Sequence, residues 1–258
     1  KTHFNKKGER MSTEEKYRCL NKDAIKYIAM FTMLLNHIAT VFMDPESAVG
    51  IIFIYAGYFT APVMIYFLLE GYEYTRSRKR YLGRLFLFAV ISELPFCLAL
   101  TQEGVLEFYG FNMLFTLCLC FLLIYIEREM THMAMRNLLI VGIFLASIFC
   151  DWALIAPAFT LFFIHGKVSA AGMKAAFVKS AVFFGAFNFL GGIGRFPIWQ
   201  NLLYAVLSMT AVGAAGFCVT VLYNGKRMEK GKNFSKWFFY IFYPAHLLIL
   251  GILRISLL

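Results

Sequence analysis

The chain has 258 residues, of which 60% are hydrophobic, and its mean hydropathy is +0.66. A soluble domain is usually about half apolar, so this composition excludes an ordinary soluble domain and indicates a polytopic helical membrane protein. The net charge is +10. In a soluble protein this charge would suggest nucleic acid, but most basic residues here lie in connecting segments, where they favour membrane orientation and contact with lipids or an anionic ligand. We therefore expect no nucleic-acid partner.

Apolar segments follow one another along nearly the whole chain. We predict about nine transmembrane segments, with ten as the alternative count, at residues 24–43, 50–72, 83–101, 111–127, 137–150, 152–164, 179–193, 200–223 and 237–257. The fifth and sixth are short, as in a broken or re-entrant pair around Asp151. The expected fold is an all-α membrane bundle, with residues 24–258 as one domain and residues 1–23 as a cytoplasmic segment without a cleaved signal peptide.

Charged residues alternate between the connecting segments. The first, third, fifth, seventh and last are basic, whereas the others are acidic or carry the single basic residue Arg195. This is the pattern of the positive-inside rule, and it predicts a cytoplasmic N-terminus. The six cysteines form no CxxC pair, so we expect free thiols, no disulfide framework and no metal site.

Several ionisable residues interrupt the apolar segments. At 1.5 Å per residue, His37 lies about 20 Å, Glu93 about 15 Å and His246 about 14 Å from the expected inner ends of their helices. Asp151 and Asn112 would lie above them, toward the outer side. Such residues can simply form hydrogen bonds between helices. Since their depths are compatible, however, we predict a shared catalytic site, in which a carboxylate orients a histidine general base.

Two further polar residues, Asn36 beside His37 and Glu70 near the end of the second segment, are candidates for substrate binding or for a structural role. Asn36 is about 100° around the helix from His37, so the two need not share a partner.

A basic cluster, "RSRKRYLGR" at residues 76–84, joins the second and third segments. It contains Arg76, Arg78, Lys79, Arg80 and Arg84. Its simplest role is orientation and contact with anionic lipids. Alternatively, it binds phosphates, because arginine forks pair with oxyanions. An acyl-coenzyme A could dock here from the cytoplasm, with its acyl end reaching inward.

Five blocks of the chain, in order, resemble the TraX family of integral membrane proteins, which includes a pilin N-acetylase. They are "LNKDAIKYIAMFTMLLNHIATVF", "APVMIYFLLEGYEYTRSRKRYLGRLFLFAVISELPF", "NMLFTL", "CDWALIAPAFTLFF" and "LYNGKRMEKGKNFSKWFFYIFYPAHLLIL". The chain departs from the family pattern at Asn36, where an aspartate is usual, and at Cys97, where an aspartate is frequent.

The resemblance implies a membrane acyltransferase of the bacterial cytoplasmic membrane that uses acetyl-CoA, or another acyl-CoA, and needs no metal. The acceptor would be a peptide, a glycan or a small amine. The resemblance directs attention to His37, Glu70, Glu93, Asn112, Asp151 and His246. The rival hypothesis is a secondary transporter or proton-coupled exporter that uses the same buried groups. A third possibility is a non-catalytic assembly scaffold, which would bind no CoA.

Overall fold

The computed structural model describes residues 17–257, and these residues are helical almost throughout. The helices are α1 (Lys22–Phe42), α2 (Ala48–Gly57), α3 (Thr60–Tyr74), α4 (Arg78–Leu100), α5 (Met113–Glu129), α6 (Met133–Ser147), α7 (Ile155–Gly166), α8 (Ala170–Gly192), α9 (Ile198–Phe217), the π-helix η2 (Cys218–Leu222) and α10 (Lys232–Ser256). The described part of the chain contains no β-sheet, which confirms the all-helical prediction. Residues 1–16 of the expected N-terminal segment lie outside the described residues.

Six helical stretches within residues 17–257 are long and apolar enough to cross a membrane: Lys22–Phe42, Ala48–Tyr74, Arg78–Leu100, Ala170–Gly192, Ile198–Leu222 and Asn233–Ser256. The three other predicted segments correspond to α5, α6 and α7, which have 17, 15 and 12 residues. The expected segments are thus all helical, but three of them are too short to qualify as spans. The number of crossings and the cytoplasmic N-terminus stay predictions.

Two helix boundaries differ from the predicted segments. The second segment is interrupted at Tyr58 and Phe59, so that it forms α2 and α3. The basic cluster is largely inside α4 rather than in a loop, because Ser77 accepts a hydrogen bond from the backbone N–H of Arg80 and begins the helix there.

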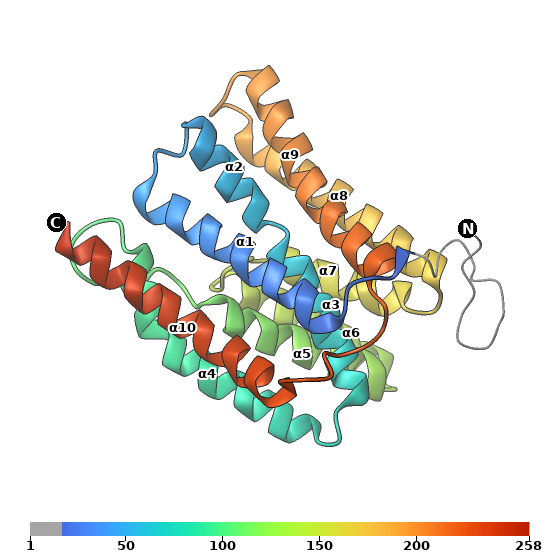
Figure 1. The fold of residues 1–258 in the computed structure, drawn as a ribbon. Coiled ribbons are helices and arrows are strands. Elements are labelled where there is room, and N and C mark those ends of the chain that lie inside the picture. The colour runs from blue at the N-terminus through green and yellow to red at the C-terminus, as the bar shows by residue number, and fades with distance from the viewer. Residues whose placement is uncertain (1–16, 258) are drawn as a thin grey trace, which may run out of the picture.

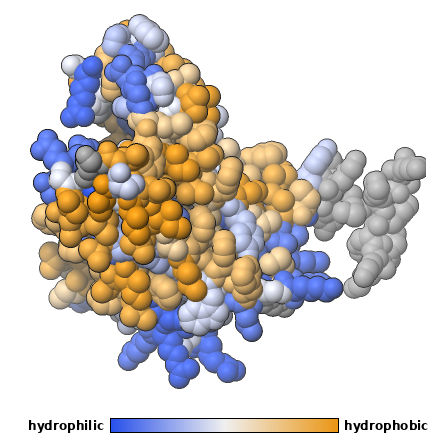
Figure 2. Space-filling view, turned by 60° about the vertical axis from the view of Figure 1, so that its left-hand side comes forward, coloured by the Kyte–Doolittle hydropathy of each residue, from blue (hydrophilic) through white to orange (hydrophobic). Residues whose placement is uncertain are grey.

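The helices α1, α4 and α10 run side by side and begin at the same end of the bundle (Figure 1). Backbone hydrogen bonds join Leu20 to Leu222 and Lys22 to Lys226, which fixes the start of α1 against the segment before α10. The helices α8 and α9 pack as a hairpin, and α2 lies along α1. Hydrophobic residues dominate the face shown in Figure 2, as expected for a protein whose helices contact lipid.

Candidate active site

Two histidines predicted to lie at similar depth form a direct pair. His37 of α1 and His246 of α10 are 9% and 5% exposed. His37 Nδ1 lies 2.8 Å from His246 Nε2, and the two rings are stacked. His246 Nδ1 lies 2.7 Å from the carbonyl oxygen of Phe242. The two histidines therefore form a chain of hydrogen bonds that ends on the backbone of α10.

The direction of this chain follows from the carbonyl, which can only accept. His246 Nδ1 must therefore carry a proton, and in the neutral ring Nε2 then has a lone pair. That lone pair accepts from His37 Nδ1–H, so the remaining lone pair of the neutral pair lies on His37 Nε2. Among the described residues, no hydrogen-bond partner meets His37 Nε2, so none of them occupies this lone pair.

Tyr243 adjoins both histidines and was not singled out by the sequence analysis. Its ring centroid lies 6.5 Å from that of His37 and 5.8 Å from that of His246. Its hydroxyl accepts a hydrogen bond from the backbone N–H of Met113 at 3.3 Å. The signal available in the sequence was position: a tyrosine three residues before His246 lies on the same face of the helix.

Glu93 binds Asn112 rather than a histidine. Glu93 Oε2 accepts from the side chain of Asn112 at 2.7 Å and from its backbone N–H at 3.2 Å. Asn112 is fully buried, also donates to the carbonyl of Ala89, and caps α5 by accepting from Leu114. The structure thus brings these two predicted residues together as a link between α4 and α5. Within residues 17–257, neither Glu93 nor Asp151 is hydrogen-bonded to an imidazole.

Asp151 lies in the turn between α6 and α7, held by its backbone. Its N–H donates to the carbonyl of Phe111, and its carbonyl accepts from the hydroxyl of Thr116 at 2.5 Å. Burial raises the pKa of the Asp151 carboxyl to about 6, although a backbone hydrogen bond from Trp152 opposes the shift. Trp152 has a φ of 58°, an uncommon value for a residue other than glycine. Burial of the Asp151 carboxyl thus favours its protonated form.

Asn36 has a structural partner of its own. Its side-chain amide donates to the carbonyl of Ile54 at 2.8 Å, and it lies against Gly57, where a Cβ would collide with it. It therefore joins α1 to α2 and does not contact the histidine pair by a hydrogen bond.

A cavity of about 880 Å³ opens where α1, α4 and α10 begin. Its described lining contains one carboxylate, that of Glu70, and eight basic side chains: Arg18, Lys22, Lys26, Arg76, Arg84, Lys167, Arg227 and Lys236. Such an excess of cations favours anions in the cavity. The lining also includes Tyr240 of α10 and Leu114 of α5, which are close in sequence to Tyr243 and Met113.

The predicted basic cluster divides between two locations. Arg76 and Arg84 line the cavity. Arg78 instead pairs with Glu129 at 2.8 Å, and the exposed side chains of Lys79 and Arg80 are not part of the lining. Most of the cavity's cations come from other segments, because the helix packing brings together residues that are far apart in the sequence.

Lys26 and Arg84 are two cavity cations without an ion pair among the described residues. In the described part of the chain, Lys26 makes no ion pair and lies over the rings of Phe67 and Phe239, at 5.8 and 4.9 Å from their centroids. Arg84 Nε is buried without a hydrogen-bond partner among the same residues. A buried donor without a partner costs free energy, which an anion in the cavity would recover.

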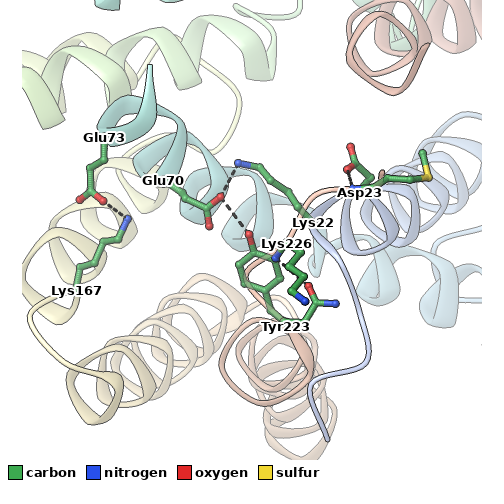
Figure 3. A network of polar contacts seen from close by, with 9 residues as sticks. Lys22, Asp23, Glu70, Glu73, Lys167, Tyr223 and Lys226 are labelled. Carbon is green, nitrogen blue, oxygen red and sulfur yellow. Dashed lines mark hydrogen bonds and ion pairs between the residues drawn. The ribbon is translucent and has the colours of Figure 1, made fainter. Parts of the chain in front are cut away.

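Glu70 belongs to an ion-pair network at the cavity wall (Figure 3). Its carboxylate accepts from Lys22 at 2.7 Å and from the hydroxyl of Tyr223 at 3.2 Å. One turn later in α3, Glu73 pairs with Lys167 at 2.5 Å. Glu70 therefore has a structural role apart from the histidine pair. Its ion pair with Lys22 joins α3 to α1 beside the cavity.

The described residues contain no group of three or more His, Cys, Asp or Glu side chains that could hold a metal ion.

Comparison with known proteins places these features in a family. Residues 21–254 match the family model described as TraX protein. The chain is also 29% identical, over 240 residues, to a probable fimbrial assembly protein FimC, serogroup H1, of Dichelobacter nodosus; the match covers 88% of this chain and 92% of that protein. No solved structure matches significantly.

Proposed function

The chain belongs to the TraX family, and on this premise we propose that it is an integral membrane acyltransferase, which transfers an acetyl or other acyl group from coenzyme A to an amine or hydroxyl acceptor. The observation that carries the proposal is that the cationic cavity and the histidine pair lie on the same two helices, α1 and α10. Tyr240 of α10 lines the cavity, and Tyr243 follows three residues, or about 4.5 Å, later along the helix.

The donor would bind through its phosphates. Coenzyme A carries phosphates at one end and the thioester at the other, so it suits a cavity whose lining contains both cations and apolar side chains. Lys26 and Arg84 would pair with phosphate oxygens, since both lack an anionic partner among the described residues. The acyl end would extend past Tyr240 toward His37.

The histidine pair would act as the base. His37 Nε2 would take a proton from the acceptor as its nitrogen or oxygen attacks the thioester carbon. The positive charge would then be shared with His246, because the Nδ1 proton of His37 can shift along the 2.8 Å hydrogen bond. When the thiolate leaves, His37 would return the proton to it. No carboxylate is required for this step, which fits a chain with Asn36 beside His37.

The acceptor would approach from the end of the site near Asp151 and Asn112. The relative from Dichelobacter nodosus is a probable fimbrial assembly protein, so the N-terminus of a pilus subunit is one acceptor to test, beside glycans and small amines. We propose the cytoplasmic membrane of a bacterium as the location.

The direct test uses the purified protein in detergent with isotope-labelled acetyl-CoA and a panel of peptide, sugar and amine acceptors. We expect label to move to at least one acceptor, and His37→Ala to slow the transfer by about 10²–10⁴. A matched control is His165→Ala, because His165 is exposed and contacts only the carbonyl of Leu161 in its own helix among the described residues. Transfer by His37→Ala at the wild-type rate would refute the mechanism.

A second candidate function is proton-coupled transport. It is favoured by interrupted helices, which transporters use at their binding sites: α2 and α3 are separated at Tyr58 and Phe59, and α6 and α7 are short. Proteoliposomes distinguish the two functions. Transport of an amine or peptide driven by a pH gradient without CoA would support the transporter, whereas transfer of label from acetyl-CoA would support the acyltransferase.

A further inference from the structure

Tyr243 is buried, yet its hydroxyl acts only as a hydrogen-bond acceptor among the described residues. The residue is 5% exposed, and the backbone N–H of Met113 donates to the hydroxyl oxygen. Among the described residues, no acceptor takes the hydroxyl proton. A buried tyrosine hydroxyl usually finds an acceptor. The proton is therefore available to a group that enters the site.

The bond from Met113 makes this hydroxyl a stronger donor. Met113 is the first residue of α5, and the N-terminus of a helix carries a partial positive charge. A hydroxyl that accepts a hydrogen bond is polarised and donates a stronger one, the more so away from water. The side chain of Asn112 caps the same helix through Leu114 and leaves the N–H of Met113 to Tyr243.

Along α10, Tyr243 lies between Tyr240 of the cavity lining and His246 of the histidine pair. Its ring adjoins both imidazoles, and Tyr240, one turn earlier on α10, lines the cationic cavity. We propose that Tyr243 is a catalytic residue whose hydroxyl donates a hydrogen bond to the oxyanion formed on the acyl carbonyl. The inference rests on the acyltransferase function proposed above and assigns the electrophilic half of that site.

The step balances as follows. The acceptor nitrogen attacks the thioester carbon, a C–N bond forms, and the carbonyl π electrons move to oxygen. The oxyanion receives the hydrogen bond of Tyr243, while His37 Nε2 takes one proton from the attacking nitrogen. The carbonyl then re-forms, the C–S bond breaks, and the thiolate takes the proton from His37. The products are the acylated acceptor and free coenzyme A, and Tyr243 keeps its proton throughout.

The alternative is a purely structural role, in which Tyr243 only accepts the hydrogen bond from the backbone N–H of Met113 at the start of α5. The first variant, Tyr243→Phe, removes both the donor and the acceptor. If Tyr243 holds the oxyanion, kcat for acetyl transfer falls by roughly 10²–10³, the loss typical of one oxyanion-hole donor, with little change in the KM for acetyl-CoA. Tyr125→Phe is the control, since Tyr125 lies on the exposed side of α5.

The second test separates donation from folding. Fluorinated tyrosine at position 243, introduced by unnatural amino-acid incorporation, keeps the ring and the oxygen that accepts from Met113 but gives a more acidic phenol. A hydrogen bond to the oxyanion predicts a single-turnover rate that rises with the number of fluorine atoms at a pH where the phenol stays protonated. A purely structural tyrosine predicts no change.

The inference is overturned if Tyr243→Phe keeps the wild-type kcat, or if its kcat falls but fluorination leaves the single-turnover rate unchanged. Either outcome leaves the acyltransferase function standing, provided that the wild-type protein transfers acetyl and His37→Ala does so far more slowly. Failure of the wild-type protein to transfer any label would instead refute the proposed function and, with it, this inference.

Discussion

Two polar regions lie along α1 and α10, and they differ in how many of their polar side chains have an ion-pair or hydrogen-bond partner. At the end where both helices begin, basic side chains outnumber acidic ones around an open cavity, and Lys26 lacks an ion pair within the described residues. About three turns further along α1, His37 and His246 are buried and hydrogen-bonded to each other. A cavity lining with more cations than anions suits the binding of an anion. Two neutral histidines that are hydrogen-bonded to each other suit the transfer of a proton. In the proposed function, binding and chemistry therefore occupy separate regions, which substitutions can test separately.

The largest expected effect comes from breaking the neutral pair. His37→Ala removes the available lone pair and should lower kcat by about 10²–10⁴, the range for loss of a general base. His246→Ala should lower kcat less, because it leaves His37 Nε2 in place and removes only the group that orients it and shares its charge. Steady-state acetyl transfer measures both values. A larger loss for His246→Ala would reverse the assigned roles.

Removing single cations from the cavity lining should weaken the binding of CoA and leave kcat for acetyl transfer largely unchanged. Arg84→Ala and Lys26→Ala should each raise the Kd for CoA by roughly 10- to 100-fold, because a hydrogen bond to a charged group contributes about 1.5–3 kcal/mol. The matched control is Lys79→Ala, whose exposed side chain lies outside the described lining. Titration with CoA gives the three constants. An equal effect of Lys79→Ala would mean that general surface charge, not the cavity, attracts the ligand.

The carboxyl of Asp151 sharpens the comparison through pH. Burial raises its pKa to about 6, so the carboxylate predominates above that pH and the neutral acid below it. If the carboxylate holds a cationic amine acceptor, the acceptor's KM rises as the pH falls through about 6. Asp151→Asn should have a raised KM at all pH values and lack this dependence. A pH profile unchanged in Asp151→Asn would show that another group titrates.

The smallest effect is expected at Asn36, which belongs to neither region. Asn36→Ala removes the hydrogen bond to Ile54 and should cost about 1 kcal/mol of stability, the usual net value of one hydrogen bond. The thermal midpoint in detergent should fall slightly, while kcat and the Kd for CoA stay unchanged. A large loss of kcat would place Asn36 in the catalytic machinery after all.

Much of the fold could be predicted because hydrophobic length determines where membrane helices form. Each of the nine expected segments contains a helix. The break at Tyr58 and Phe59 could not be foreseen, since an apolar run does not reveal a local turn that neighbouring helices bury. The helices α6 and α7 were recognisable as short apolar runs. Whether either of them crosses the membrane depends on where the bilayer lies, which hydropathy alone does not determine.

The candidate site was predicted in part. Helix rise, together with the topology predicted from the charged connecting segments, predicted compatible depths for His37 and His246. The partner of each histidine depends on helix rotation and packing, which depth does not give; the structure pairs the two rings and leaves Glu93 to Asn112. Lys22 and Lys26 were not candidates in the sequence, because only the packed bundle brings them into the same cavity lining as Arg84.

The most direct test of the separation between binding and chemistry is the Kd for CoA of His37→Ala, measured beside those of wild type and Arg84→Ala. We predict that CoA binds His37→Ala as tightly as wild type although the variant transfers acetyl about 10²–10⁴ times more slowly, and that Arg84→Ala binds CoA at least tenfold more weakly. Loss of CoA binding in His37→Ala with unchanged binding in Arg84→Ala, or no binding by the wild-type protein, would contradict the account.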